Sequence, residues 1–212
     1  ALMPGKARSA DLNGDGFTDL VMSAPAVSVE AFQGGGVFVY AGTAEGLDPA
    51  PVQRLGGEKR DEWGYGLDLA DVDGDGQFDL LVGAEEDDEA GGAAGAVHVF
   101  SGLADGFFTD EPTSTILGPR GNARFGRSLA VCDFDGDGFL DLAVGAYTDE
   151  NQLAPEPQND QGAVYLHKGS AAGFDALPDQ ILWGQDYVGG LWIDDPSQLL
   201  GLYVAAADTD GD

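Results

Sequence analysis

Short apolar segments recur along the chain, and turn-forming residues separate them. Each segment has four to seven residues rich in Val, Leu and aromatic side chains, and Gly, Asp or Pro bounds it at both ends. This pattern is typical of β-strands joined by tight turns. No stretch shows a helical period of useful length. The pattern therefore predicts an all-β chain.

The predicted strands occur in sets that repeat along the sequence. Each set has a short apolar run after an acidic loop, then a glycine-led alternating stretch, then a weaker strand. The sets are 19–25, 36–42 and 52–55; 79–84, 95–102 and 114–117; and 141–146, 162–169 and 180–183. This gives about four strands in about 60 residues, the size of a β-propeller blade. We expect one domain, 1–212, with blade units at about 4–62, 63–124 and 125–198 and a partial fourth at 199–212.

The acidic loop is the most regular part of the repeat. It reads DLNGDGFTD at 11–19, DVDGDGQFD at 71–79 and DFDGDGFLD at 133–141, so the copies begin 60 and 62 residues apart. A fourth copy begins at Asp208, 75 residues after the start of the third, and runs to Asp212. Because the flanking residues align as well, the repeated unit is larger than the loop.

The loop composition points to a hard metal ion. Carboxylates at loop positions 1, 3 and 5 converge because the intervening glycines permit a tight turn with positive φ. Oxygen ligands at this density suit Ca²⁺, which accepts about six to eight of them. An EF-hand needs a bidentate Glu at position 12, but the residues there are Met22, Val82 and Val144. The last carboxylate is instead at position 9, so we predict calcium loops that join two strands of one sheet.

A single Asp- and Gly-rich turn is also compatible with a solvated hairpin connection, but three copies in register favour calcium. Loop one carries Asn13 at position 3 and has three carboxylates, whereas loops two and three have four each. We therefore expect loop one to bind calcium most weakly. Without metal, the crowded carboxylates repel one another, so the ions are expected to be structural rather than catalytic.

The charge of the chain excludes several classes of partner. It has 38 acidic and 9 basic residues among 212, and a formal net charge of −29. Nucleic-acid binding needs a basic surface, so we expect no nucleic-acid partner. No apolar stretch approaches the roughly 20 residues of a membrane-spanning helix, so membrane insertion is not expected. The single cysteine, Cys132, permits no internal disulfide.

The motifs of the third unit resemble the FG-GAP repeat of integrin α-subunit β-propellers and their bacterial relatives. They are Phe125-Gly126, the loop 133–141, the run Asp141-Leu-Ala-Val-Gly-Ala-Tyr147 and Gly162-Ala-Val-Tyr165. The resemblance implies that calcium loops join the first two strands of each blade and face away from the surface that usually engages partners. By position, it implies these ligands: Asp11, Asn13, Asp15, the Phe17 carbonyl and Asp19; Asp71, Asp73, Asp75, the Gln77 carbonyl and Asp79; Asp133, Asp135, Asp137, the Phe139 carbonyl and Asp141.

Two features depart from the family pattern. Propellers of this family have seven blades, whereas about 60 residues per blade gives this chain about 3.5, half of such a ring. Either the sequence is a fragment or two chains close one ring, and burial of open blade faces favours a homodimer. The fourth loop lacks a carboxylate at position 9, so Asp208, Asp210 and Asp212 form at most a partial fourth site.

No motif in the sequence singles out a catalytic centre. A nucleophile elbow, a zinc pattern and a phosphate-binding loop before a helix are all missing, so we expect no enzyme. The leading hypothesis is a calcium-binding module for adhesion or protein interaction that works in an extracellular, cell-surface or periplasmic setting. The alternatives are a carbohydrate-binding or polysaccharide-degrading calcium propeller and a self-assembling structural unit. The ligand, an unknown protein or glycan, is not identified by any motif.

An acidic run also lies on the rim that is predicted to face away from the loops. Glu85-Glu86-Asp87-Asp88-Glu89 follows the second strand of the second unit. The run can bind a cation or a basic partner, but a charge run of this kind is usually a solvated loop.

Overall fold

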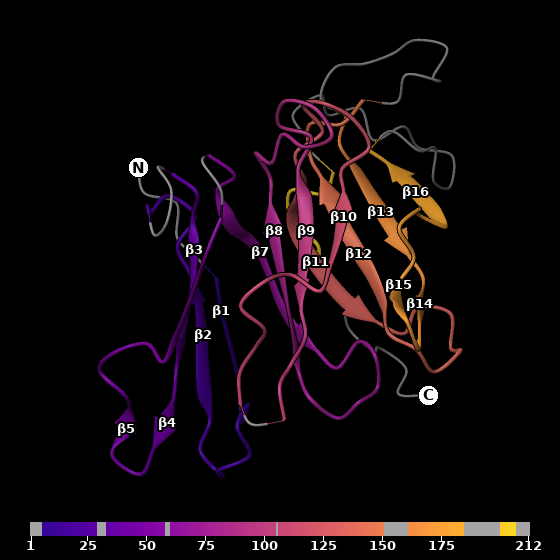
Figure 1. Cartoon of the computed structure of the whole chain (residues 1–212). Coiled ribbons are helices and arrows are strands. Elements are labelled where there is room, and N and C mark those ends of the chain that lie inside the picture. Colours follow the sequence, from indigo (N-terminus) through magenta and orange to yellow (C-terminus); the bar gives the residue numbers. More distant parts are fainter. Residues whose placement is uncertain are drawn as a thin grey trace.

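The structure, a computed structural model, describes residues 6–28, 33–57, 60–104, 106–150, 161–184 and 200–206. In these ranges the chain forms strands, turns and loops but no helix. Three four-stranded antiparallel sheets stand side by side along an arc (Figure 1). The prediction of an all-β chain made of propeller blades is confirmed.

Each sheet is a meander in which every strand pairs with the next strand of the same sheet. Blade one contains β1 (Ala7–Ala10), β2 (Asp19–Ser23), β3 (Gly36–Tyr40) and β6 (Gln53–Gly56). Blade two contains β7 (Trp63–Ala70), β8 (Asp79–Ala84), β9 (Ala96–Phe100) and β10 (Ser114–Leu117). Blade three contains β11 (Phe125–Cys132), β12 (Asp141–Ala146), β13 (Ala163–His167) and β16 (Gln180–Trp183). Two-residue strands form small hairpins, β4 (Gly42–Thr43) with β5 (Gly46–Leu47) and β14 (Gly169–Ser170) with β15 (Gly173–Phe174).

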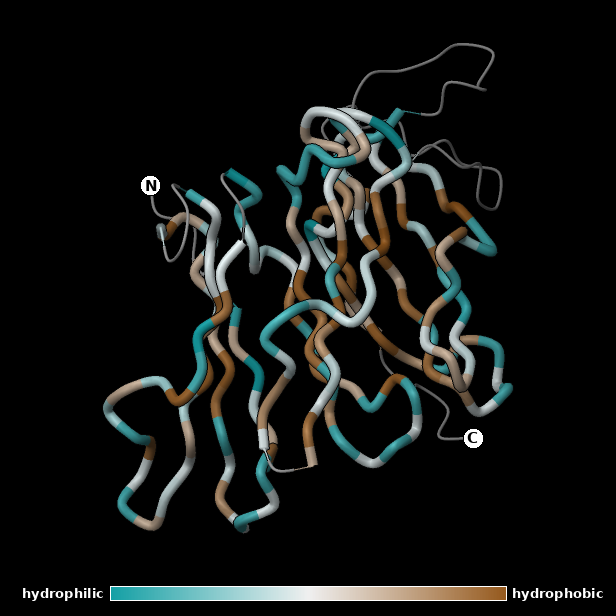
Figure 2. Tube along the Cα trace, viewed as in Figure 1, coloured by the Kyte–Doolittle hydropathy of each residue, from teal (hydrophilic) through white to brown (hydrophobic). Residues whose placement is uncertain are grey.

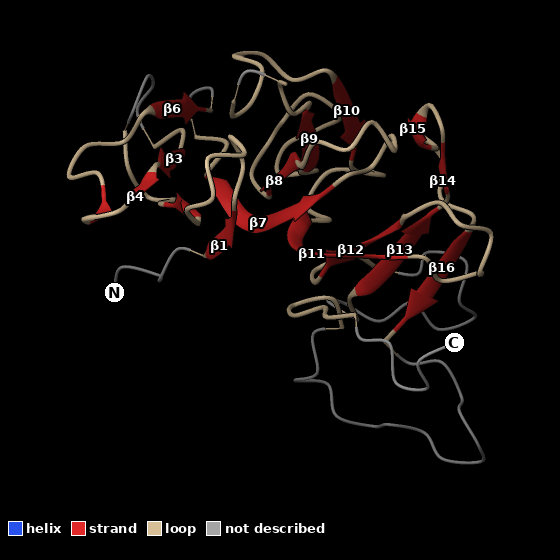
Figure 3. Cartoon of the chain, turned by 90° about the horizontal axis from the view of Figure 1, so that it is seen from below, coloured by secondary structure: helices blue, strands red, loops and turns tan. Residues whose placement is uncertain are grey.

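The first strand of each blade lies on the inner side of the arc, and the weak fourth strands β6, β10 and β16 lie on the outer side (Figure 3). Hydrophobic residues lie mainly along the middle of the strands, and hydrophilic residues are more frequent in the loops at both ends (Figure 2). Strands β8 and β12 are buried along their whole length, because each lies inside a sheet that has neighbours on its faces.

Apolar residues fill the space between successive blades. Val21 of blade one packs in one cluster with Leu80 and Val82 of blade two. Leu81, on the other face of β8, packs in a second cluster with Leu142 and other residues of blade three. The alternation of side chains along a strand thus sends alternate residues of the second strand to the two neighbouring blades.

Close backbone contacts also join the blades, and they explain the repeated glycines. The hydroxyl of Ser23 in blade one donates to the carbonyl of Gly64 in blade two at 2.7 Å. A Cβ on Gly83 would stand 1.9 Å from the carbonyl oxygen of Gly126 in blade three, so no side chain fits there. Gly64 and Gly126 both have positive φ, at 105° and 92°. The Trp63-Gly64 and Phe125-Gly126 dipeptides at the start of β7 and β11 are therefore joints between blades.

The segment 200–206 repeats this joint on the far side of blade three. The hydroxyl of Ser128 donates to the carbonyl of Gly201 at 2.8 Å, and a Cβ on Gly145 would meet the same oxygen at 1.9 Å. Leu200 and Val204 pack on an apolar cluster of blade three that includes Ala143. A fourth unit thus begins as the second and third do. Its acidic loop, with Asp208, Asp210 and Asp212, lies outside the described residues.

Candidate metal centres

The three acidic loops lie on one rim of the arc, at the lower end in Figure 1. Each one connects the first strand of a blade to the second, β1 to β2, β7 to β8 and β11 to β12. The expected position of the loops within a blade is therefore confirmed.

Each loop folds around the carboxylate at its first position. In loop two, Oδ1 of Asp71 accepts hydrogen bonds from the backbone N–H of Gly74 at 2.9 Å and Asp75 at 3.1 Å, and Oδ2 accepts one from Gly76 at 2.9 Å. Gly74 and Gly76 have φ of 76° and 88°, which an L side chain rarely adopts. Loop three makes the same three bonds to Asp133. The glycines at positions 4 and 6 therefore let the turn close on a carboxylate.

The carboxylate at position 9 is the most buried group in each loop. Oδ2 of Asp79 accepts the N–H of Val72 at 2.8 Å, and Oδ1 accepts the N–H of Gly102, beyond the third strand, at 2.9 Å. Burial raises the pKa of Asp79, and these two backbone hydrogen bonds oppose that shift. The same pair of bonds, at 2.7 to 2.9 Å, joins Asp19 to Leu12 and Gly42 and Asp141 to Phe134 and Gly169.

The position 9 carboxylate therefore has a structural task that the sequence analysis missed. It ties the loop to the chain segment that follows the third strand of the same blade. The signal for it was present, because a glycine ends each of the three glycine-led stretches at 36–42, 95–102 and 162–169. A Cβ at Gly42 would stand 2.3 Å from the carbonyl oxygen of Thr18, so the segment can approach the loop only with glycine there.

Carboxylates at positions 1, 3 and 9 come together in loops two and three. In each of these loops, one oxygen from each of the three carboxylates lies within 4.8 Å of the other two. The residues are Asp71, Asp73 and Asp79 in loop two and Asp133, Asp135 and Asp141 in loop three. Hard oxygen donors at this spacing fit a calcium ion, with Ca–O distances of about 2.4 Å. The position 5 carboxylates, Asp75 and Asp137, lie outside these two groups. Each accepts the N–H of the position 7 residue through Oδ1, at 2.8 and 2.9 Å.

Loop one joins the same two strands of its blade but has a different candidate ligand, an amide, at position 3. The side-chain oxygen of Asn13 accepts the N–H of Asp15 at 3.0 Å, and its amide nitrogen donates to Oδ2 of Asp15 at 3.1 Å. Asp15 in turn accepts the N–H of Phe17 at 2.8 Å. The amide supplies one neutral oxygen where the other two loops supply a charged one.

Residues 125–167 match the model of the FG-GAP repeat, and residues 10–82 match that of the FG-GAP-like repeat. The chain belongs to the FG-GAP repeat family. Integrin alpha-3 of Mus musculus is 39% identical over 128 residues, which are 58% of this chain and 11% of that protein. Integrin alpha-4 of Xenopus laevis is 34% identical over 152 residues, 68% of this chain and 14% of the relative. Integrin alpha-V of Gallus gallus is 31% identical over 183 residues, 82% of this chain and 16% of the relative.

The FG-GAP chain thus spans less than one fifth of the length of these integrin relatives. In the part that the structure describes, it has no helix of the length and apolar character needed to cross a membrane.

Loop three of the FG-GAP chain differs from the other two by a basic neighbour. Nζ of Lys168 lies 2.8 Å from Oδ2 of Asp135 at position 3. The hydrogen bond from Lys168 lowers the pKa of this carboxyl group. The corresponding residues before the glycine are Ala41 in blade one and Ser101 in blade two, and neither carries a charge. Loop three therefore has a competing cation beside one of its candidate ligands.

On the opposite rim, the acidic run 85–89 is divided among three environments. Asp87 lies 3.6 Å from Nε2 of His98; burial would raise the pKa of this carboxyl group, but the interactions with His98 lower it. Asp88 and Glu89 are exposed, as expected for a solvated loop. Glu85 and Glu86 instead turn toward two arginines of blade three, and Glu85 is buried.

Proposed function

We propose that this FG-GAP chain is a calcium-stabilised module that binds a protein partner in adhesion, outside the cell or in the periplasm. The observation that carries the proposal is the group of three carboxylates in each of loops two and three, in a chain whose relatives are integrin α-subunits. The partner is expected on the rim opposite the acidic loops, because loops on a rigid scaffold are common binding elements.

The ions would be held by residues at loop positions 1, 3, 5 and 9 and the carbonyl at position 7, and the full ligand set of each loop stays a prediction. A bound calcium ion supplies positive charge where several carboxylates meet. The chain contributes a loop that is already closed by backbone hydrogen bonds to its carboxylates. Because an ion that binds only the folded state stabilises it, a chelator should lower the melting temperature.

We also propose that a second copy of the chain completes the ring. Leu80 and Val82 of β8 face blade one and are fully buried. The corresponding residues of β2 are Leu20 and Met22, which are half-buried and exposed. Among the residues that the structure describes, no blade covers the face of blade one that would receive a preceding blade. Another blade with the same joint would cover it.

The function is tested by immobilising the chain and probing it with an array of extracellular proteins and an array of glycans, each with calcium and with chelator. We expect calcium-dependent binding to one or more proteins and no binding to glycans. The matched variant is Asp71→Asn, which removes a candidate ligand of loop two and should weaken the binding. Glycan binding or polysaccharide hydrolysis would replace the proposal with a carbohydrate-directed function. Self-association alone would indicate a structural unit.

A further inference from the structure

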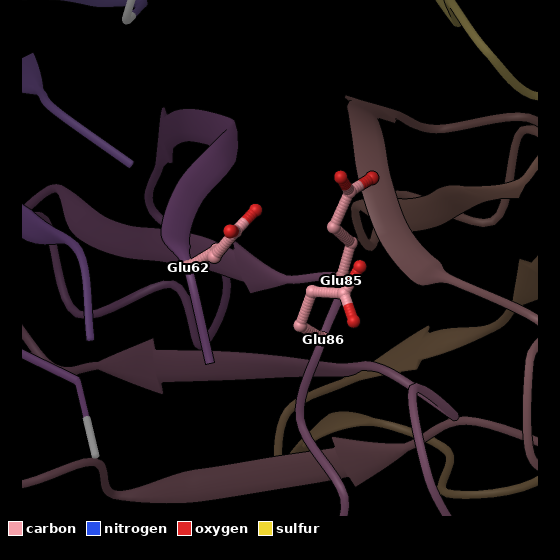
Figure 4. Close-up of side chains that lie close together, drawn as sticks. All are labelled: Glu62, Glu85 and Glu86. Carbon is pink, nitrogen blue, oxygen red and sulfur yellow. The ribbon is translucent and has the colours of Figure 1, made fainter. Parts of the chain in front are cut away.

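We propose that Glu62, Glu85 and Glu86 form a cation site of a second kind, which binds a hard divalent ion such as Ca²⁺ on the rim opposite the acidic loops. Glu62 precedes β7, and the other two residues follow β8. Glu62 reaches toward Glu85 and Glu86 from a different segment of the chain (Figure 4). One oxygen from each carboxylate lies within 4.8 Å of the other two. Two oxygens that bind one ion at about 2.4 Å lie at most about 4.8 Å apart, so the three carboxylates meet this requirement for a shared ion.

A buried oxygen without a partner provides independent support for a ligand. Glu85 is only 2% exposed. Its Oε1 accepts a hydrogen bond from Arg127 at 2.9 Å, but its Oε2 is buried and has no hydrogen-bond partner among the residues that the structure describes. An unpaired buried carboxylate oxygen is strongly unfavourable. A cation between the three glutamates would satisfy it.

Two arginines of blade three contact the first carboxylate oxygen, Oε1, of Glu85 and of Glu86, and neither contacts Oε2 of Glu85. Nη1 of Arg124 lies 2.5 Å from Oε1 of Glu86 and 3.6 Å from Oε1 of Glu85. Arg127 stacks 4.2 Å from the ring centre of Tyr65, which fixes its guanidinium. Groups that hold the second oxygen of a ligating carboxylate commonly orient it toward a metal ion. The arginines are thus compatible with an ion on the other side of Glu85.

The charges of the cluster are not balanced by the arginines. Three carboxylates face two guanidinium groups. Glu85 is buried, and Arg124 and Arg127 form their ion pairs here with Glu85 and Glu86 rather than with Glu62. The anionic cluster is therefore short of positive charge, which a divalent ion supplies.

The three carboxylates of the site belong to blade two, and they are not a feature of the repeat. The residue that follows the Gly-Ala or Ser-Ala pair of the second strand is Pro25 in blade one, Glu85 in blade two and Tyr147 in blade three. The residue that precedes the first strand is Glu62 in blade two and Arg124 in blade three, and both have positive φ. The site therefore does not depend on the acidic loops or on the proposed binding function.

The test is a count of calcium ions per chain, by equilibrium dialysis and elemental analysis, at free calcium that saturates the wild-type chain. Glu62→Gln is the informative variant, because Glu62 makes no ion pair with either arginine and lies at the surface side of the cluster. We expect Glu62→Gln to bind one ion fewer than wild type. Glu89→Gln, which removes an exposed acid of the same rim outside the cluster, should bind the full number.

A second pair of variants separates this site from the loops. Asp71→Asn should lose one ion from loop two, and the double variant with Glu62→Gln should lose two. Thermal melting confirms that each variant folds, and Glu86→Gln replaces Glu62→Gln if the latter does not fold. A wild-type ion count in folded Glu62→Gln, or loss of the same ion in Glu89→Gln, would overturn the proposal. Loss of an ion from Asp71→Asn with none from Glu62→Gln would leave the loops as the calcium sites and reject the rim site.

Discussion

Position 3 of the acidic loops sets how many negative charges face a bound ion. Asn13 gives loop one a neutral oxygen where Asp73 and Asp135 give the other loops a carboxylate. One unit charge about 4 Å from another contributes about 1 kcal/mol in water, and more with a divalent ion, but salt screens part of it. We therefore expect Asn13→Asp to raise the calcium affinity of loop one about tenfold. Calorimetric titration should show that the weakest class of sites in wild type is strengthened. An unchanged weakest class would mean that loop one is not that class.

Lys168 lies beside position 3 of loop three, where we expect it to lower the calcium affinity. Its ammonium group pairs with Asp135 and would repel a divalent ion held by that carboxylate. We expect Lys168→Ala to raise the calcium affinity of loop three about threefold, since the pair is exposed and screened. Lys168→Arg keeps the charge and should leave the affinity near that of wild type.

The reverse substitution tests the same argument in loop two. Ser101→Lys places a cation at the position corresponding to Lys168, so it should lower the calcium affinity of loop two by a similar factor. Both effects should shrink as ionic strength rises, because the charges are at the surface. An effect of Lys168→Ala that does not depend on salt would indicate a change in loop structure instead.

At the scale of elements, the joint between blades depends on glycines, because a side chain at these positions would push the two strands apart. In Gly83→Ala the new methyl group would stand 1.9 Å from the carbonyl oxygen of Gly126, so β8 and β11 must move apart. Forcing an extra methyl group into a packed interface costs about 1–3 kcal/mol or more. We expect a fall in the melting temperature of several degrees, measured with excess calcium.

Gly92→Ala is the matched control for this joint. A Cβ at Gly92 meets no atom within 4 Å, and its φ lies outside the left-handed region. This variant should melt within about a degree of wild type. An equal fall in melting temperature for the two variants would show that the effect comes from glycine replacement in general rather than from the joint.

The strands and loops could be predicted from the sequence because their causes are local. Apolar runs bounded by glycine and aspartate indicate strands, and even the weak fourth strand at 114–117 coincides with β10. The cluster at Glu62 could not be predicted, because its members are 23 residues apart and meet arginines of the next blade. The backbone bond from Gly102 to Asp79 was missed for the same reason, since it joins segments that only the folded sheet brings together.

At the scale of the whole molecule, the alternation of side chains shows which faces need a neighbour. In blade two, Leu80 and Val82 face blade one, and Leu81 faces blade three. Blade three buries Leu142 and Val144 against blade two, and Ala143 against the start of the fourth unit at Leu200. Blade one has its own pair at Leu20 and Met22, but the described residues place no blade against them. The same pattern that makes the array also leaves one face of it open.

That open face predicts the behaviour of the chain in solution. If a second copy covers it, light scattering with excess calcium should give twice the mass of one chain. Met22→Asp adds a charge to the face while Met22 is already 36% exposed, so it should yield monomers with a nearly unchanged melting temperature. Leu177→Asp, at a residue that is 80% exposed in a turn of blade three, is the control and should stay dimeric. A wild-type chain that is monomeric at every concentration would exclude closure by a second copy, and another blade would then have to cover Met22.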